Sequence, residues 1–242
     1  MKKRLLGSSE SIIIKIILLL TLIFGFNDGK ETFVFSNWIV NLILVFIIVS
    51  LVVLFYILGL KLAAKYYGTK IKIKIWNSHK FKNALTFGKK ALLIYSTPIL
   101  NVLVTILSNG KIFLANVMSF DVDPNVIGRR YQYLNYFNIS MIVFFGLLFS
   151  LILMWIFKLF EFDLGLKISF WFILFQLLPI SELPGAKLLA GSVTFYVFNL
   201  VFFLFNILLL QLTSSFATLF VSLIFSVVLA TLYFVFFQYK RA

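Results

Sequence analysis

Long runs of apolar residues alternate along the chain with short polar connections. Most of these runs approach or exceed the roughly 20 apolar residues that a helix needs to cross the hydrocarbon core of a bilayer. They are continuously apolar and lack the two-residue alternation of a barrel strand, so we expect them to form transmembrane helices. The expected spans are residues 12–26, 38–60, 138–157, 166–180, 193–210 and 216–237.

Two further apolar features leave alternatives open. Residues 91–107 are interrupted by Pro98 and carry Asn101, so this stretch either crosses the membrane or enters it and returns. The first span follows a basic start, Lys2-Lys3-Arg4, which also suits a signal peptide. No small-x-small cleavage site follows it, so we expect a retained membrane anchor.

The pattern changes within the connection 61–137. Residues 69–76 alternate polar and apolar side chains, which predicts a strand with one wet face and one buried face. A second candidate strand covers residues 112–122, just before a turn signal at Asp123-Pro124-Asn125. We therefore predict an all-α polytopic membrane protein, a single membrane domain over residues 1–242, with a small cytoplasmic β element.

Composition narrows the class further. Hydrophobic residues make up 62% of the chain and charged residues only 12%, which excludes an ordinary soluble domain. The chain has no cysteine, so disulfides, thiolate metal sites and cysteine nucleophiles are excluded.

The basic residues indicate an orientation. If the N-terminus is cytoplasmic and 91–107 is re-entrant, 18 of the 22 lysines and arginines lie on the cytoplasmic side. We therefore expect an integral protein of the cell membrane with both termini in the cytoplasm. The net charge of +14 is then primarily a topology signal and secondarily a surface for anionic lipids. Membrane lipids are expected partners, and nucleic acid is not.

Two separated stretches carry a family resemblance. The first is Tyr56-Ile57-Leu58-Gly59-Leu60, followed by a basic helix end and the alternating strand. The second is residues 176–187, QLLPISELPGAK, at the end of a later span. In their order along the chain these features resemble the site-2 proteases, a family of intramembrane zinc metalloproteases, and especially its archaeal-type members. The resemblance covers most of residues 45–210, and its most specific part is the Leu-Pro-x-x-x-Leu-x-Gly element.

The resemblance implies that the catalytic groups are missing. The family uses His-Glu-x-x-His on one helix and an aspartate on another to hold and activate zinc. At these positions the chain has Tyr56, Ile57, Leu60 and Pro184. None of these is a plausible substitute, so we expect no catalytic residue, no metal ligand and no cofactor. The single histidine, His79, follows the strand in a Lys-rich loop and is expected to be solvated.

A chain without the catalytic groups could still bind a membrane segment without cleaving it. The resemblance implies that Gln176, Pro179 and Gly185 form a site for a substrate or partner segment beside a broken helix. Asn199 and Asn206 lie seven residues apart on one helix face and could hydrogen-bond another helix, from a partner or from this chain. We also expect Glu182 to be a loop carboxylate paired with Lys187.

Three functional hypotheses follow. The first is an inactive pseudoprotease that binds a transmembrane segment or membrane partner. The second is a membrane scaffold or assembly subunit with only architectural resemblance to the family. The third is an active intramembrane metalloprotease, in which case zinc would be bound by ligands that the motifs do not reveal.

Overall fold

The computed structural model describes residues 3–28, 34–76, 96–123, 135–212 and 217–238. These residues form two compact units, each made of several chain segments. The first unit consists of Met1–Leu54, Ile71–Asp123 and Ser181–Leu183, and the second of Phe55–Lys70, Pro124–Ile180 and Pro184–Ala242.

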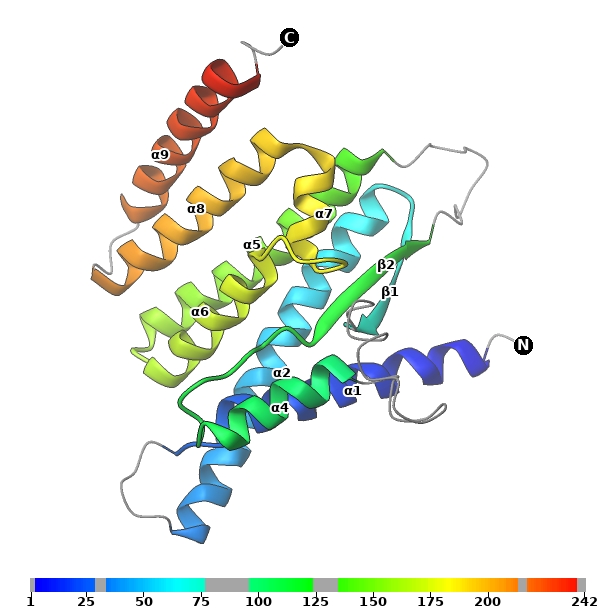
Figure 1. Ribbon diagram of the computed structural model, residues 1–242, viewed down its shortest axis with the longest axis vertical. Coiled ribbons are helices and arrows are strands. Elements are labelled where there is room, and N and C mark those ends of the chain that lie inside the picture. The colour runs from blue at the N-terminus through cyan, green and yellow to red at the C-terminus, as the bar shows by residue number, and fades with distance from the viewer. Residues whose placement is uncertain (1–2, 29–33, 77–95, 124–134, 213–216, 239–242) are drawn as a thin grey trace. The chain divides into compact units, whose positions relative to one another are not determined.

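The first unit combines helices with a small sheet. Helix α1 (Lys3–Gly25) packs on α4 (Ser96–Leu107), and α2 (Phe35–Tyr66) follows α1 along the chain (Figure 1). The end of α1 is tied to the start of α2 by side-chain hydrogen bonds from Trp38 to the Phe26 carbonyl, at 3.0 Å, and from Asn41 to the Gly25 carbonyl, at 3.2 Å. Gly25 allows this close approach, because a Cβ there would lie 2.9 Å from the Leu42 Cδ2 atom.

The predicted β element is confirmed as a two-stranded antiparallel sheet. Strand β1 (Lys70–Ile75) pairs with β2 (Met118–Asp123). Along β1, Lys72 is exposed and Ile73 is buried, as the alternating pattern predicts. β2 begins at Met118, six residues after the predicted start at 112. The Asn101 side chain of α4 donates to the Asn116 carbonyl at 3.0 Å, in the extended segment that leads into β2.

The described residues of the second unit are mostly helical. It contains the end of α2, α5 (Tyr136–Leu159), α6 (Asp163–Leu177), α7 (Pro184–Gly191), α8 (Val193–Leu212) and α9 (Ala217–Tyr233). A short π-helix, η2 (Phe234–Gln238), continues α9. Helix α5 packs on α6 and α7, and α8 packs on α7 and α9 (Figure 1).

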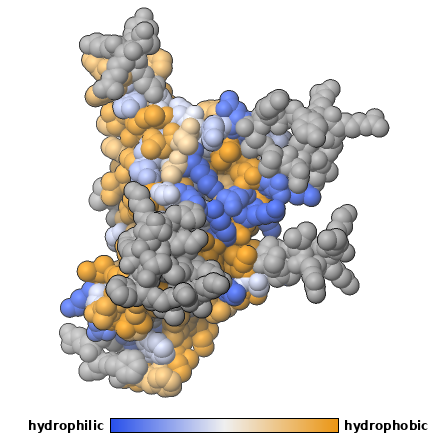
Figure 2. Space-filling model, turned by 45° about the vertical axis from the view of Figure 1, so that its right-hand side comes forward, coloured by the Kyte–Doolittle hydropathy of each residue, from blue (hydrophilic) through white to orange (hydrophobic). Residues whose placement is uncertain are grey.

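Helix α9 is apolar on its outside and small or polar on its packed side. Its buried residues recur every fourth position and are Thr218, Ser222, Ser226 and Ala230. Large apolar side chains face outward, among them Phe220, which is 72% exposed. This is the reverse of a water-soluble helix and suits a helix that faces lipid, where small residues let neighbouring backbones approach. Apolar residues also cover much of the face drawn in Figure 2.

Four helices among the described residues are long and apolar enough to cross a membrane, which supports an integral membrane protein. They are Phe35–Tyr66, Tyr136–Leu159, Val193–Leu210 and Ala217–Phe237. The other two expected spans, 12–26 and 166–180, overlap α1 and α6 but run past their ends at Gly25 and Leu177. However, α6 has 15 residues and is about 22 Å long, shorter than the ~30 Å hydrocarbon core. Six spans therefore stays a prediction, and so do the single membrane domain and the orientation.

The seventh apolar stretch contains α4, and its residues 91–95 lie outside the described part. The 12 described residues of α4 are about 18 Å long. Both alternatives for residues 91–107, a full span and a re-entrant segment, therefore stay open.

Candidate site at the break between α6 and α7

The first motif-like stretch lies on α2 in the second unit. Tyr56 and Leu60 are one helical turn apart and have no exposed surface, and Ile57 is also buried. The Tyr56 ring packs edge-on against Phe172 of α6, with ring centroids 5.4 Å apart. These side chains therefore fill the interface where the resemblance implies two metal-binding histidines.

Two glycines bring α2 and α5 into close approach. A Cβ on Gly59 would lie 2.5 Å from the Phe145 carbonyl oxygen and 3.0 Å from the Gly146 Cα. On the other side of the contact, a Cβ on Gly146 would lie 2.8 Å from Leu60 and 2.9 Å from Tyr56. Small residues at such contacts allow membrane helices to pack backbone to backbone. The glycine that the sequence offers as part of a weak motif is thus a packing residue.

The second motif-like stretch forms the break between α6 and α7. Helix α6 ends at Leu177, three residues before the predicted end at Ile180, and Leu178 is extended with ψ of 129°. The cause is Pro179, which disfavours helical backbone in the residue before it and has no N–H to donate. Pro184 then occupies the first position of α7, where proline is favoured because its missing N–H is not needed.

Gly185 is confined by the end of α6. A Cβ at this position would overlap the carbonyl oxygens of Leu177 and Leu178. The hydroxyl of Tyr196, on α8, donates to the same Leu177 carbonyl at 3.3 Å. Tyr196 is a site residue that sequence reasoning missed, because only the fold brings α8 to this carbonyl.

Gln176 lies at the end of α6 and is 1% exposed. Neither its amide nitrogen nor its amide oxygen has a hydrogen-bond partner among the described residues. The hydroxyls of Tyr56 and Ser169 are also buried and unpartnered in that part of the chain. Ser169, Phe172 and Gln176 follow one another at helical spacing on the buried face of α6. The contact of Tyr56 with Phe172 thus joins the first motif-like stretch to α6, four residues before Gln176.

Buried polar groups without partners are rare in folded proteins, because leaving one unpaired costs about 1–3 kcal/mol. The cost is not relieved in hydrocarbon, where no water is available. Gln176 is therefore the most unusual residue at the break. Pro179 differs from it, since Pro179 is exposed.

The two asparagines of α8 have different partners. Asn206 donates to the Ser222 hydroxyl of α9, which confirms the expected bond to another helix and places it within this chain. Asn199 donates instead to the Phe195 carbonyl of its own helix, at 2.7 Å.

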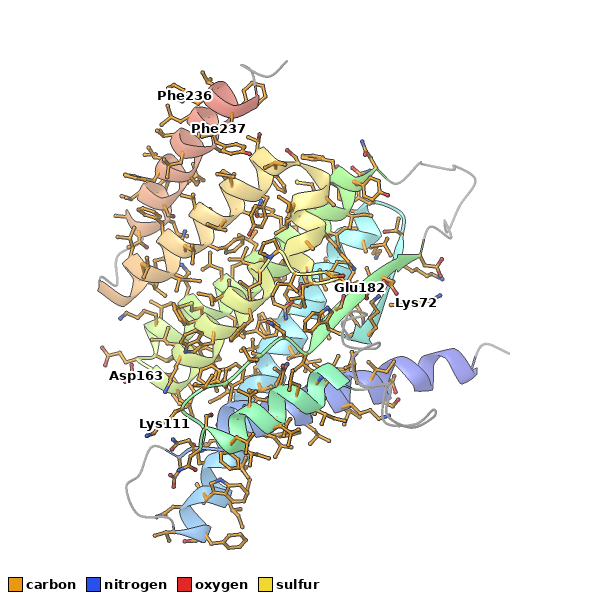
Figure 3. All side chains as sticks on the ribbon, viewed as in Figure 1. Lys72, Lys111, Asp163, Glu182, Phe236 and Phe237 are labelled. Carbon is orange, nitrogen blue, oxygen red and sulfur yellow. The ribbon has the colours of Figure 1, made fainter. Side chains whose placement is uncertain are left out.

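Glu182 belongs to the first unit and has a partner that the sequence analysis did not find. Its carboxylate lies 2.8 Å from the Lys74 ammonium, although 108 residues separate the two. Figure 3 labels Glu182 in the segment between α6 and α7 and Lys72 on β1. The Ser119 hydroxyl donates to the Glu182 carbonyl, and the Trp76 indole donates to the Ser181 carbonyl at 2.6 Å. Glu182 has a φ of 63°, rare for a residue with a side chain, and these contacts hold it there.

Two lysines of β1, Lys72 and Lys74, are paired with carboxylates. Lys74 also lies 2.9 Å from Asp121, and Lys72 lies 2.8 Å from Asp123. Partial burial lowers the pKa of Lys74, but hydrogen bonds to Glu182 and Asp121 outweigh it, so the pKa lies above its ordinary value. The hydrogen bond to Asp123 likewise raises the pKa of Lys72 above its ordinary value.

In the part of the chain that the structure describes, no group of three or more histidine, aspartate or glutamate side chains could hold a metal ion. His79 lies outside the described residues. Comparisons with protein-family models, with curated proteins and with solved structures find no match. The resemblance to the site-2 proteases therefore stays a prediction that rests on the residues quoted for it, and the chain itself is a helical membrane protein.

Proposed function

We propose that this protein binds an extended segment of a transmembrane partner at the break between α6 and α7, without cleaving it. The observation that carries the proposal is the buried amide of Gln176, which has no hydrogen-bond partner among the described residues. An amide offers both a donor and an acceptor, which is what the backbone of an unwound segment requires. Binding would thus satisfy groups that are unpaired in the free protein.

The Gln176 amide differs from the backbone groups beside it at the break. The Leu177 carbonyl accepts from the Tyr196 hydroxyl and the Leu178 carbonyl accepts from the Ile180 N–H, whereas both polar atoms of the amide lack a partner among the described residues. Because Gln176 is buried, the partner reaches it only when neighbouring residues move. Pro179 and Ile180 are both exposed, and Pro179 prevents the α6 helix from extending over them.

The lack of cleavage follows from residue chemistry. Tyr56, Ile57, Leu60 and Pro184 stand where the resemblance implies two histidines, a glutamate and an aspartate. Leucine, isoleucine and proline side chains have no atom that can bind a metal or move a proton. The Tyr56 hydroxyl is buried beside Phe172 and would be only one ligand, where the family's zinc site uses three.

The experiment places a photo-crosslinking amino acid at Ile180 in native membranes. We expect an adduct of discrete mass that contains the partner at full length. Gln176→Leu should abolish the adduct at unchanged expression, because leucine cannot hydrogen-bond the partner backbone. A crosslinker at Leu232, on the lipid-facing side of α9 and 46% exposed, serves as the matched control and should give no such adduct.

Other outcomes select the other hypotheses. An adduct at Ile180 that persists in Gln176→Leu would contradict binding through the amide and favour a scaffold with only architectural resemblance. A partner recovered in two fragments would reopen the metalloprotease alternative, with zinc as its cofactor.

A further inference from the structure

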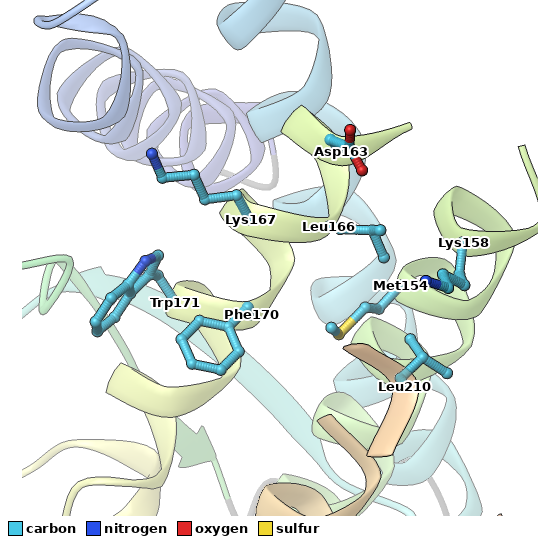
Figure 4. A pocket seen from close by; sticks show the side chains of 8 residues that line it. All are labelled: Met154, Lys158, Asp163, Leu166, Lys167, Phe170, Trp171 and Leu210. Carbon is cyan, nitrogen blue, oxygen red and sulfur yellow. The ribbon is translucent and has the colours of Figure 1, made fainter. Parts of the chain in front are cut away.

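A cavity lies at the N-terminal end of α6, at the opposite end of that helix from the break. Its volume is about 400 Å³, within the range of small-molecule sites. It is lined from α5, α6 and α8, all within the second unit (Figure 4). The cavity therefore offers a site that the motif-like residues do not touch.

The rim of the cavity is charged. Lys158, in the last turn of α5, lies on one side, and Lys167 of α6 lies on the other, with Asp163 near the start of α6 (Figure 4). Neither lysine has an ion pair among the described residues. Lys167 follows Asp163 by one helical turn, a spacing that permits pairing, yet the two are not paired. Two ammonium groups against one carboxylate leave a net positive rim.

The remaining lining is apolar. Met154 lies one turn before Lys158 on α5, Leu210 comes from α8, and Trp171 lies one turn after Lys167 on α6. Leu166, Phe170 and Trp171 of α6 are half-buried and keep accessible apolar surface, whereas Met154 and Leu210 are buried. A cationic rim over an apolar floor is complementary to an amphiphile with an anionic head.

The position of the cavity identifies the kind of amphiphile. It lies at the end of α5, one of the four helices long enough to cross the membrane. The end of such a helix is at the level of the lipid headgroups, where Trp and Lys side chains are favoured. We propose that the cavity binds an anionic phospholipid, with its phosphate between Lys158 and Lys167 and the upper part of one acyl chain against Leu166 and Phe170. Asp163 then accepts a hydrogen bond from a headgroup hydroxyl.

The test compares lipids on the purified full-length protein. Short-chain phosphatidylglycerol should be retained in native mass spectrometry and should raise the thermal midpoint in detergent. Phosphatidylcholine of the same chain length should do neither, and inorganic phosphate alone should be without effect because it cannot occupy the apolar floor. Equal binding of phosphatidylcholine, or an equal shift from inorganic phosphate, would overturn the proposal.

The variants locate the site. Lys158→Gln with Lys167→Gln should weaken phosphatidylglycerol binding about 30-fold, since each basic residue contributes about fivefold near an anionic headgroup. Lys65→Gln, which changes an exposed lysine at the end of α2, is the matched control and should bind as the wild type does. Affinity unchanged in the double variant, or lost equally in Lys65→Gln, would refute binding at this cavity. Lipid-free thermal midpoints of all variants verify that each one folds.

Discussion

Replacing Gln176 with leucine should stabilise the protein. The folded state holds the Gln176 amide buried with neither atom hydrogen-bonded among the described residues, whereas the unfolded state in detergent exposes it to water. An unpaired buried amide costs about 1–3 kcal/mol, and leucine removes that cost. Leucine leaves a small void in place of the amide, which costs up to about 1 kcal/mol. We therefore expect a net gain of about 1 kcal/mol in the free energy of unfolding.

The matched control creates the same defect elsewhere. Ser222→Ala removes the hydroxyl that accepts a hydrogen bond from the Asn206 amide. The buried Asn206 amide is then unpaired, as the Gln176 amide is in the wild type. Hydrogen bonds between membrane helices average about 0.6 kcal/mol and reach about 1.7 kcal/mol, so Ser222→Ala should destabilise the protein by an amount in that range. Adding Asn206→Leu to Ser222→Ala should restore part of the loss.

The assay is equilibrium unfolding in mixed micelles with increasing sodium dodecyl sulfate, followed by circular dichroism. The midpoint should rise for Gln176→Leu and fall for Ser222→Ala, with the slope of the transition unchanged. A fall of 1 kcal/mol or more for Gln176→Leu would refute the reasoning, because it would mean that the amide is hydrogen-bonded in the folded protein.

Three further predictions concern packing and charge in the same unfolding assay. Gly59→Ala should lower the free energy of unfolding by about 1–3 kcal/mol, because the new Cβ meets a backbone carbonyl. Gly146→Ala should lower it less, because its Cβ meets side chains that can move. The reverse order of the two losses would contradict this account. Gly191→Ala should destabilise the protein because its Cβ would overlap the Ser140 hydroxyl. Adding Ser140→Gly to the same chain should recover part of the loss. If the two changes in unfolding free energy simply add, the two residues are not in contact. The raised pKa of Lys74 means that its ion pairs stabilise the fold below about pH 10.5 and that this contribution is lost as the pH rises through the raised pKa. The unfolding midpoint should therefore fall less between pH 9 and pH 12 in Lys74→Gln than in the wild type, and equal falls would contradict the assignment.

Local features of the fold were predictable from the sequence. The long apolar runs give α2, α5, α8 and α9 directly, because a helix in hydrocarbon needs only length and apolar side chains. The alternation of lysine and isoleucine gives β1 within one residue at either end. The end of α6 at Leu177 was also readable, since Pro179 restricts the residue before it, although the predicted span ran past it to Ile180.

Long-range pairs of the candidate site were not predictable. The contacts of Lys74 with Glu182 and of Tyr196 with the Leu177 carbonyl join elements whose proximity is set by the fold alone. Charge and spacing pointed to Lys187 as the partner of Glu182, because residues near in sequence are the only neighbours that a single sequence reveals. The unpaired amide of Gln176 was equally hidden, since a glutamine in a helix gives no sign of what surrounds it.

The segment Ser181–Leu183 has a consequence for biosynthesis. This segment completes the unit that contains the sheet, yet the ribosome makes it only after α5 and α6. Chains fold from the N-terminus as they are made, at about 5–20 residues per second. Lys74, Ser119 and Trp76 therefore lack their partners at Ser181 and Glu182 until α5 and α6 have been synthesised. The two strands can pair before that point, but the contacts that hold Ser181 and Glu182 to them form late, after the helices on which the candidate site depends have been made.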